Sequence, residues 1–432
     1  MRANSSQSSL SRAAFRSSNF RRYMLARFLT TTSSEMQSVA VAWQIYSITH
    51  RPLDLGLVGL AQFLPGILLF LIAGHTADRI ARQRILQICY AGFSVCSLSL
   101  LVLALLGTAS VHPIYAALLL NGAVRAFSAP AGQAFLPRLV PQEHFPNAVA
   151  WSASILQTAT IVGPVVGGLI YGAAGSPAPV YASAVMAYLG SLFFVSRIRI
   201  QPTEHRQTAA SPAIVLEGLK YIWRNKLIFS AISLDLFAVL LGGAVALLPV
   251  YAREILNVGA TGLGILRSAP GVGAVIMAII VAYWPIQRRA GTTMLLCVFA
   301  FGLLTIVFGL SRNLALSLAM LVLIGAFDMV SVIIRHTMIQ LGTPDEMRGR
   351  VSAVNTVFIG ASNEVGQFES GLTAQWFGAV PAVVLGGLGS VAIVTAWAWL
   401  FPELRSVDKL VPPAGAMISS DNSASVPDLA KE

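Results

Sequence analysis

Nine ionisable side chains lie within long apolar stretches of this chain, where a charge is costly. Exposing all nine to lipid would cost on the order of 27 kcal/mol, at roughly 3 kcal/mol each. They therefore cannot all face lipid, and those that face protein or water could pair, bind ions, move protons or hold a charged substrate. The nine are Arg27, Arg125, Arg267, Arg335, Glu35, Asp235, Asp328, Glu364 and Glu369.

The nine charged residues differ in their position along the apolar stretches. Arg27 and Arg335 are expected near one membrane face, where a long side chain can reach the interface. Glu35, Arg125 and Asp328 fall near the middle, so we expect a polar cavity between helices close to the bilayer midplane. The side chains predicted to bind substrate or couple ions are Glu35, Arg125, Asp235, Asp328, Arg335 and Glu364.

Two explanations of the buried charges remain open. In the first, Glu35, Asp235 and Asp328 carry protons, because burial in an apolar site disfavours the charged form of a carboxyl group. Arg125 would then tune a carboxyl group or hold an anionic substrate. In the second, the charges form inert salt bridges, such as Arg125 with Asp328, that hold the protein together.

The elements that must position these residues are membrane-spanning helices. Hydrophobic residues make up 56% of the chain and charged residues 11%, and the mean hydropathy is +0.72, far too apolar for a soluble globule. Apolar runs of about 20 residues recur along the chain. The predicted spans are 24–48, 56–74, 85–106, 113–133, 148–171, 178–196, 227–251, 259–283, 292–311, 313–338, 351–373 and 380–401.

The first and fourth spans each carry a polar face. In the first, Arg27, Thr31, Ser34, Glu35 and Ser38 recur at helical spacing. In the fourth, Asn121, Arg125 and Ser128 share one side. A helix that is polar on one face within a bilayer needs water or protein against that face.

The chain is an internal duplication. Residues 120–128 align with residues 323–331, at an offset of 203, and Val162-Gly163 aligns with Val365-Gly366. In this alignment Arg125 corresponds to Asp328, so equivalent positions carry opposite charge. We predict an all-α membrane protein of twelve helices in two pseudo-symmetric six-helix bundles.

Basic residues define the expected orientation. With the N-terminus inside, 22 of the 29 Lys and Arg residues fall in cytoplasmic segments, as the positive-inside rule requires. The net charge of +11 then reflects this asymmetry and anionic lipid, so no nucleic-acid partner is expected. We predict an inner-membrane protein, a monomer, with both termini cytoplasmic; an organellar transit peptide is the alternative account of residues 1–22.

These spans divide the chain into five segments. Residues 197–226 contain a short amphipathic helix expected to lie on the inner membrane face, and the final segment is rich in Ser and Pro. The predicted segments are a cytoplasmic N-terminal tail (1–23), an N-terminal bundle (24–196), a cytoplasmic linker (197–226), a C-terminal bundle (227–401) and a disordered cytoplasmic tail (402–432).

The residues give little support to enzymatic chemistry. Cys89, Cys96 and Cys297 all fall in predicted spans, without a CxxC pair or a His/Cys cluster at metal-ligand spacing. Neither HExxH nor GxSxG is present, and there is no phosphate-binding loop. We therefore expect no catalysis, no metal and no cofactor.

Three motifs resemble those of the major facilitator superfamily, over nearly all of residues 15–405. Gly74, Asp78, Arg79 and Arg82 match its loop between the second and third spans. Residues 163–168, with Gly163, Pro164, Gly167 and Gly168, resemble its antiporter motif, and residues 344–351, with Arg348, Gly349 and Arg350, resemble its loop between the tenth and eleventh spans.

Within the superfamily, Ala126-Phe-Ser-Ala-Pro130 and Leu139-Val-Pro141-Gln-Glu143 are similar to the enterobactin-exporter subfamily. The resemblance implies alternating access, with Asp78 and its arginines latching the cytoplasmic side in one state. It favours proton-driven efflux of a small organic molecule, siderophore-like or drug-like. Lysophospholipid movement, proton-coupled uptake and a non-transporting sensor remain alternatives.

Overall fold

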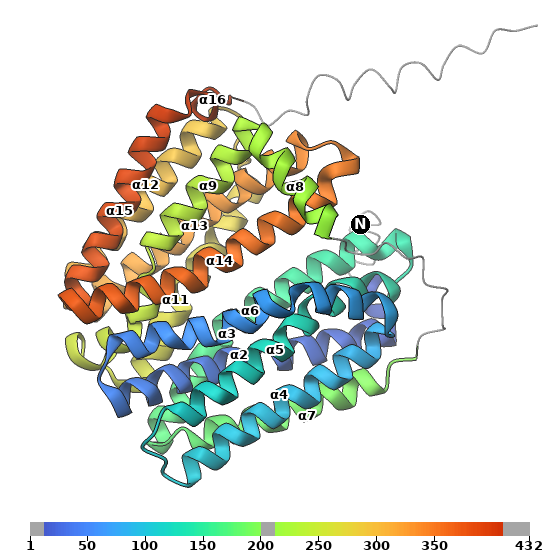
Figure 1. The fold of residues 1–432 in the computed structure, drawn as a ribbon, viewed down its shortest axis with the longest axis vertical. Coiled ribbons are helices and arrows are strands. Elements are labelled where there is room, and N and C mark those ends of the chain that lie inside the picture. Colours follow the sequence, from blue (N-terminus) through green and yellow to red (C-terminus); the bar gives the residue numbers. More distant parts are fainter. Residues whose placement is uncertain (1–12, 200–211, 409–432) are drawn as a thin grey trace, which may run out of the picture.

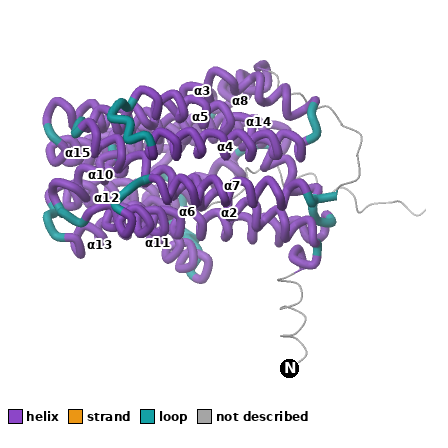
Figure 2. Tube along the Cα trace, turned by 90° about the horizontal axis from the view of Figure 1, so that it is seen from below, coloured by secondary structure: helices purple, strands orange, loops and turns teal. Residues whose placement is uncertain are grey.

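A computed structural model describes residues 13–199 and 212–408, and every regular element in these ranges is a helix (Figure 2). The N-terminal helices are η1 (Ala13–Arg16), α2 (Ser18–Thr49), α3 (Pro52–Arg79), α4 (Arg82–Leu105), α5 (His112–Phe135), η2 (Leu136–Arg138), η3 (Gln142–His144), α6 (Phe145–Ala174) and α7 (Ala178–Ser196). The C-terminal helices are α8 (Pro212–Arg224), α9 (Lys226–Leu241), η4 (Ala244–Leu247), α10 (Leu248–Val250), η5 (Tyr251–Ile255), α11 (Gly259–Tyr283), α12 (Ala290–Leu310), α13 (Leu314–Gly342), α14 (Asp345–Phe377), α15 (Ala379–Leu400) and α16 (Pro402–Arg405).

Local sequence signals explain where the helices begin and end. Asn313 accepts hydrogen bonds from the amides of Ala315 and Leu316 and so caps α13. Pro52 stands in the first turn of α3, where no amide donor is needed. Gly175 ends α6 in the left-handed conformation that favours glycine.

Ten segments of the described chain are long and apolar enough to cross a membrane. The prediction of twelve spans is consistent with the fold, because α2 and α14 are 32 and 33 residues long and pack among the other ten. These two helices are more polar than the rest, and they carry Glu35 and Glu364.

The two halves repeat one packing pattern, as the duplication predicts. In the N-terminal half, α2 packs on α6 and α7, α3 on α5, and α4 on α5 and α7. The C-terminal half repeats these pairs as α9 on α14 and α15, α11 on α13, and α12 on α13 and α15. Two bundles related by a pseudo-twofold axis are therefore confirmed.

The halves meet at one end of the molecule and diverge at the other (Figure 1). Between them, α6 packs on α11 and α3 on α14. We call the end with the α2–α3 and α6–α7 turns the closed end; the opposite end, where α2 begins and α8 lies, is the open end. An apolar cluster at the closed end joins both halves through Val39, Tyr46, Leu247 and Leu263.

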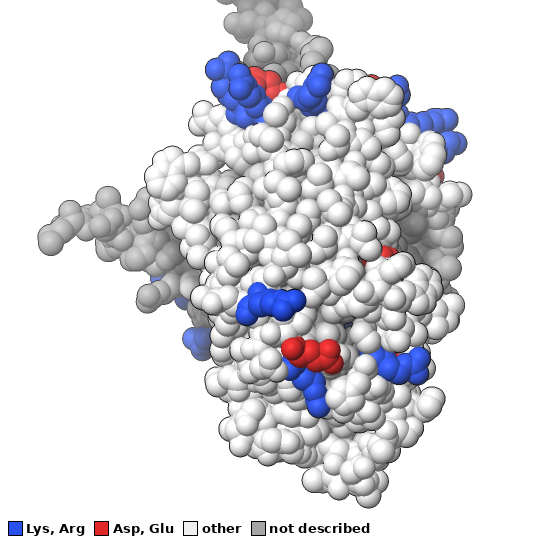
Figure 3. All heavy atoms as spheres, turned by 90° about the vertical axis from the view of Figure 1, so that its left-hand side faces the viewer, with Lys and Arg blue, Asp and Glu red and all other residues white. Residues whose placement is uncertain are grey.

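Glycines allow this close approach. A Cβ atom on Gly168 of α6 would come within 2.7 Å of the Ala260 carbonyl oxygen and 2.9 Å of the Gly264 Cα atom. Between α3 and α14, a Cβ atom on Gly371 would likewise come within 2.9 Å of the Gly56 Cα atom. The face at the left of Figure 1 carries few charged side chains (Figure 3), and the halves approach each other there through glycines and apolar side chains.

The predicted seventh span, 227–251, is not one continuous helix. α9 ends at Leu241, and the chain continues through Gly242-Gly243, η4, α10 and the π-helical turn η5 as far as Ile255. The glycine pair and Pro249 explain the interruption, since neither residue type sustains a regular helix.

Helices extend into both of the predicted tails. α2 begins at Ser18, within the predicted N-terminal tail. At the other terminus, α16 packs on α12, where Leu404 is fully buried, and residues 407 and 408 accept hydrogen bonds from the start of α12. The predicted disordered tail was thus wrong for residues 402–408, and its remainder, 409–432, lies outside the described residues, as do residues 1–12 and 200–211.

Candidate functional site

A polar cavity of about 370 Å³ lies within the N-terminal bundle. α2 contributes Arg27, Thr31, Ser34 and Glu35 to its wall, from the polar face recognised in the sequence. The other lining residues are Tyr23, Thr30, Leu86, Tyr90, Phe93, Asn121, Arg125, Ser128, Ala129, Gly132, Gln133, Leu156 and Tyr188. We call this space the polar cavity.

Arg125 joins the polar cavity to the other half. Its side chain is 59% exposed, and its Nη1 atom lies 3.5 Å from Glu364 Oε1 on α14. Glu364 is only 13% exposed and also accepts a hydrogen bond from Gln367, at 3.2 Å. The pairing of Arg125 with Asp328 was therefore wrong: α14, rather than α13, presents the acid.

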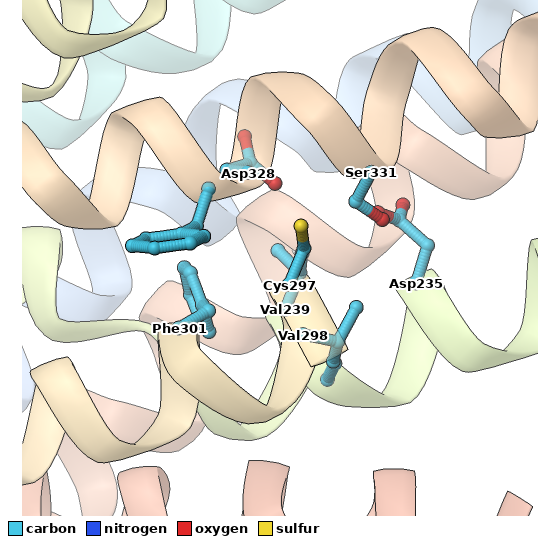
Figure 4. A pocket seen from close by; sticks show the side chains of 9 residues that line it. Asp235, Val239, Cys297, Val298, Phe301, Asp328 and Ser331 are labelled. Atoms are coloured by element: carbon cyan, nitrogen blue, oxygen red, sulfur yellow. The ribbon is translucent and has the colours of Figure 1, made fainter. Parts of the chain in front are cut away.

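Asp328 lies instead inside the C-terminal bundle. It lines a small pocket of about 10 Å³, about the least space that holds one water molecule. Figure 4 shows Asp328 and Ser331 on α13, with Asp235, Cys297 and Phe301 from neighbouring helices around the pocket. Among the described residues, no ion pair joins Asp328 to a basic side chain.

Asp235 forms an ion pair with Arg335, linking α9 to α13. The side chains are 8% and 2% exposed, so this pair is buried in the core of the C-terminal bundle. Arg335 Nε has no hydrogen-bond partner, so the guanidinium depends on this one carboxylate. The sequence placed Arg335 near a membrane interface, but the side chain does not extend to water.

Residues 163–168 form a packing surface on α6. Gly163 lies against Glu35 and Gly167 against Met36, both on α2, while Gly168 faces α11. The motif therefore holds the polar face of α2 on one side and the other half of the protein on the other. Pro164 is buried inside α6 and its carbonyl oxygen faces Gly264.

The loop residues predicted to act in gating lie at the open end. Arg82 donates to the Ala134 carbonyl oxygen at 3.1 Å and so ties α4 to α5. Arg348 pairs with Asp345 at 2.6 Å, and Arg350 with Glu217 of α8 at 2.5 Å. Gly74 lies in α3 and Gly349 in α14; the side chains of Asp78 and Arg79 lie outside the described part of the structure.

Sequence reasoning missed the aromatic wall of the polar cavity. Tyr23, Tyr90, Phe93 and Tyr188 come from α2, α4 and α7 and look like ordinary apolar positions in the sequence. It named Arg267 of α11 among the charges in the apolar stretches but did not assign it to the site, and this arginine lies near enough to Glu364 to influence it electrostatically. The ion pair of Glu364 is with Arg125 of the other half.

This arrangement can bind a charged or polar organic molecule beside aromatic rings. The ion pair between Arg125 and Glu364 links that cavity to the opposite half. A second acidic residue, Asp328, lies in a separate pocket. No group of three or more His, Cys, Asp and Glu side chains that could hold a metal ion occurs in residues 13–199 and 212–408.

A family model that covers residues 9–420 makes this chain a transporter of the major facilitator superfamily, and solved transporters share its fold. The nucleoside transporter NupG has a similar fold, with a TM-score of 0.66 and 13% identity over 89% of this chain and 99% of that one. A bacterial homologue of the human lysosomal transporter Spinster, in an inward-facing and unoccupied conformation, gives a TM-score of 0.68 and 14% identity, over 90% and 96% of the two chains.

The particular family follows from the sequence match. The chain belongs to the transmembrane secretion effector family, whose model matches residues 9–420. The enterobactin exporter EntS of Shigella boydii serotype 4 (strain Sb227) is 28% identical over 379 residues, covering 86% of this chain and 85% of that protein. EntS of Escherichia coli O1:K1 / APEC is 27% identical over the same length. The protein is therefore a multi-pass protein of the inner membrane.

Proposed function

We propose that this protein exports a small organic molecule by alternating access, driven by proton antiport. The polar cavity carries the proposal: it lies in one half, and Arg125 on its wall contacts Glu364 of the other half at 3.5 Å. A substrate that engages Arg125 competes with Glu364, so binding alters a contact between the halves. The exporters named among its relatives support this direction of transport.

We propose that this state is inward-open. Basic residues concentrate at the open end, and the positive-inside rule supports a cytoplasmic location for that end and for both termini. The polar cavity would then take its cargo from the cytoplasm, while contacts at the closed end seal the outer side. Aromatic rings and arginines on the cavity wall suit a siderophore-like or drug-like molecule.

Asp328 is the leading proton carrier. It faces a small pocket and pairs with no basic side chain among the described residues, whereas Asp235 is committed to Arg335. Glu35, on the wall of the polar cavity, is the second candidate. Protonation there would be coupled directly to occupancy of the cavity.

Transport in proteoliposomes tests the proposal. Enterobactin and a cationic dye serve as probes, with an imposed pH gradient. We expect Asp328→Asn to abolish uphill transport yet retain exchange of labelled for unlabelled probe, because the substrate cavity is untouched. Asp408→Asn, which removes an exposed carboxylate on the tail, is the control. Uphill transport that persists in Asp328→Asn and in Glu35→Gln would refute the proton role of both residues.

A further inference from the structure

One face of α8 is fixed to the C-terminal bundle at the open end. Ile222 is 3% exposed and packs in a cluster with Val351 and Val354 of α14. A Cβ atom on Gly218 would come within 2.8 Å of the Arg350 carbonyl oxygen. Arg350 donates to Glu217 at 2.5 Å, so polar and apolar contacts both join helix α8 to the beginning of α14.

The opposite face of α8 is largely exposed among the described residues. Leu216, Leu219 and Trp223 are 65%, 38% and 72% exposed, and their spacing places them on one side of the helix. Lys220 and Arg224 are exposed beside them. An apolar stripe flanked by cations is the pattern of a helix that lies in the membrane interface.

Aromatic contacts connect α8 to the ends of two spanning helices. The Trp223 ring packs edge-on against Phe229, with centroids 5.1 Å apart, and Phe229 is 6.0 Å from Phe401. Trp397 continues this row, at 5.6 Å from Phe401. Tryptophan gathers where hydrocarbon gives way to headgroups, and here the row marks the start of α9 and the end of α15.

We infer that this face of α8 binds anionic phospholipid headgroups and that the Glu217–Arg350 pair passes the contact to α14. Leu216, Leu219 and Trp223 enter the boundary between headgroups and acyl chains, while the two cations meet negative headgroups. Because α14 carries Glu364, lipid charge then influences how the two halves meet. The inference concerns a lipid surface and does not depend on which substrate is carried.

Fluorescence quenching tests the lipid contact. The full-length protein is reconstituted in phosphatidylcholine vesicles containing either brominated phosphatidylglycerol or brominated phosphatidylcholine. The Trp223 signal is the difference between wild type and Trp223→Phe. We expect phosphatidylglycerol to quench it preferentially, and Lys220→Gln with Arg224→Gln to weaken that preference by roughly tenfold or more.

Arg288→Gln with Arg289→Gln is the matched control, because it removes two exposed cations from the same end of the bundle but from another loop. This double substitution should leave the preference of Trp223 quenching for phosphatidylglycerol unchanged. Equal quenching by both lipids, or equal loss in the control, would overturn the inference. So would an absence of quenching by either lipid, since α8 would then be covered by something other than the bilayer.

A distance measurement tests the coupling to α14. Spin labels on cysteines introduced at the exposed residues Arg84 and Glu346 report the separation of the halves at the open end. Phosphatidylglycerol should shift the distances in wild type. Glu217→Gln should keep the lipid preference and lose the shift, and an unaltered shift in this variant would contradict the coupling.

Discussion

At the scale of single residues, the charges in this protein fall into two groups. Arg125 and Glu364 meet across the seam between the halves, beside a cavity that has room for water and cargo. Asp235 and Arg335 meet inside one half and are almost completely removed from solvent. Pairs of the first kind can exchange partners during transport, whereas a pair of the second kind is part of the core.

Removing one member of the buried pair should therefore destabilise the protein. Asp235→Asn leaves Arg335 without its counter-charge, and we expect it to lower the free energy of unfolding by about 3–5 kcal/mol. Replacing both residues with apolar ones should cost less than either single change, because no isolated charge remains. Unfolding in mixed micelles measures both effects.

The exposed pair between Arg288 and Asp408 provides the comparison, since its side chains are 80% and 51% exposed. Asp408→Asn should change the free energy of unfolding by less than about 1 kcal/mol. A similar cost for Asp235→Asn would show that the buried pair contributes little to the fold.

At the scale of elements, the sequence predicted most of the helices but not their rotation. The polar faces of the first and fourth spans were recognisable because their spacing is helical, and both line the polar cavity. The partner of Arg125 could not be recognised in the sequence. Helical periodicity shows which residues share a face of a helix, but it does not show which neighbouring helix that face contacts. The sequence suggested Asp328 as the partner, and only the packing of α14 identifies Glu364.

The contact between α6 and α11 is expected to tolerate no side chain at Gly168. Its Cβ atom would meet backbone atoms, which cannot move aside as a flexible side chain can. Gly168→Ala should destabilise the protein by roughly 1–3 kcal/mol and reduce transport. Gly360→Ala, on a helix where the added atom meets nothing within 4 Å, is the control, and equal behaviour of the two variants would refute this account of the seam.

At the scale of the whole molecule, a few polar contacts join the two halves at the closed end. Tyr46 donates a hydrogen bond to Glu254, and Arg253 donates to Ser47 at 2.5 Å. Arg253 also lies over the Trp43 ring, 5.8 Å from its centroid. These contacts join α2 of one half to η5 of the other, so they must break before the closed end can open.

Tyr46→Phe should therefore shift the protein toward its outward-facing state. A hydrogen bond to a charged group contributes about 1.5–3 kcal/mol, so we expect the equilibrium to move by roughly tenfold or more. Distances between labels at the open end measure the shift. Tyr115→Phe is the control, because its hydroxyl donates to Asp54 at 3.0 Å within one half; a matching shift there would exclude a role for the inter-half contact.

The exchange of sign between positions 125 and 328 has a consequence for how the duplicated unit can assemble. The position equivalent to Glu364 in the N-terminal half is Ile161. If two N-terminal halves were paired in the same way, Arg125 of one would lie against the aliphatic Ile161 side chain of the other. Two second copies would bring Asp328 toward Glu364, acid against acid. Only unlike copies therefore place opposite charges at this contact, so the two halves are not interchangeable within the molecule.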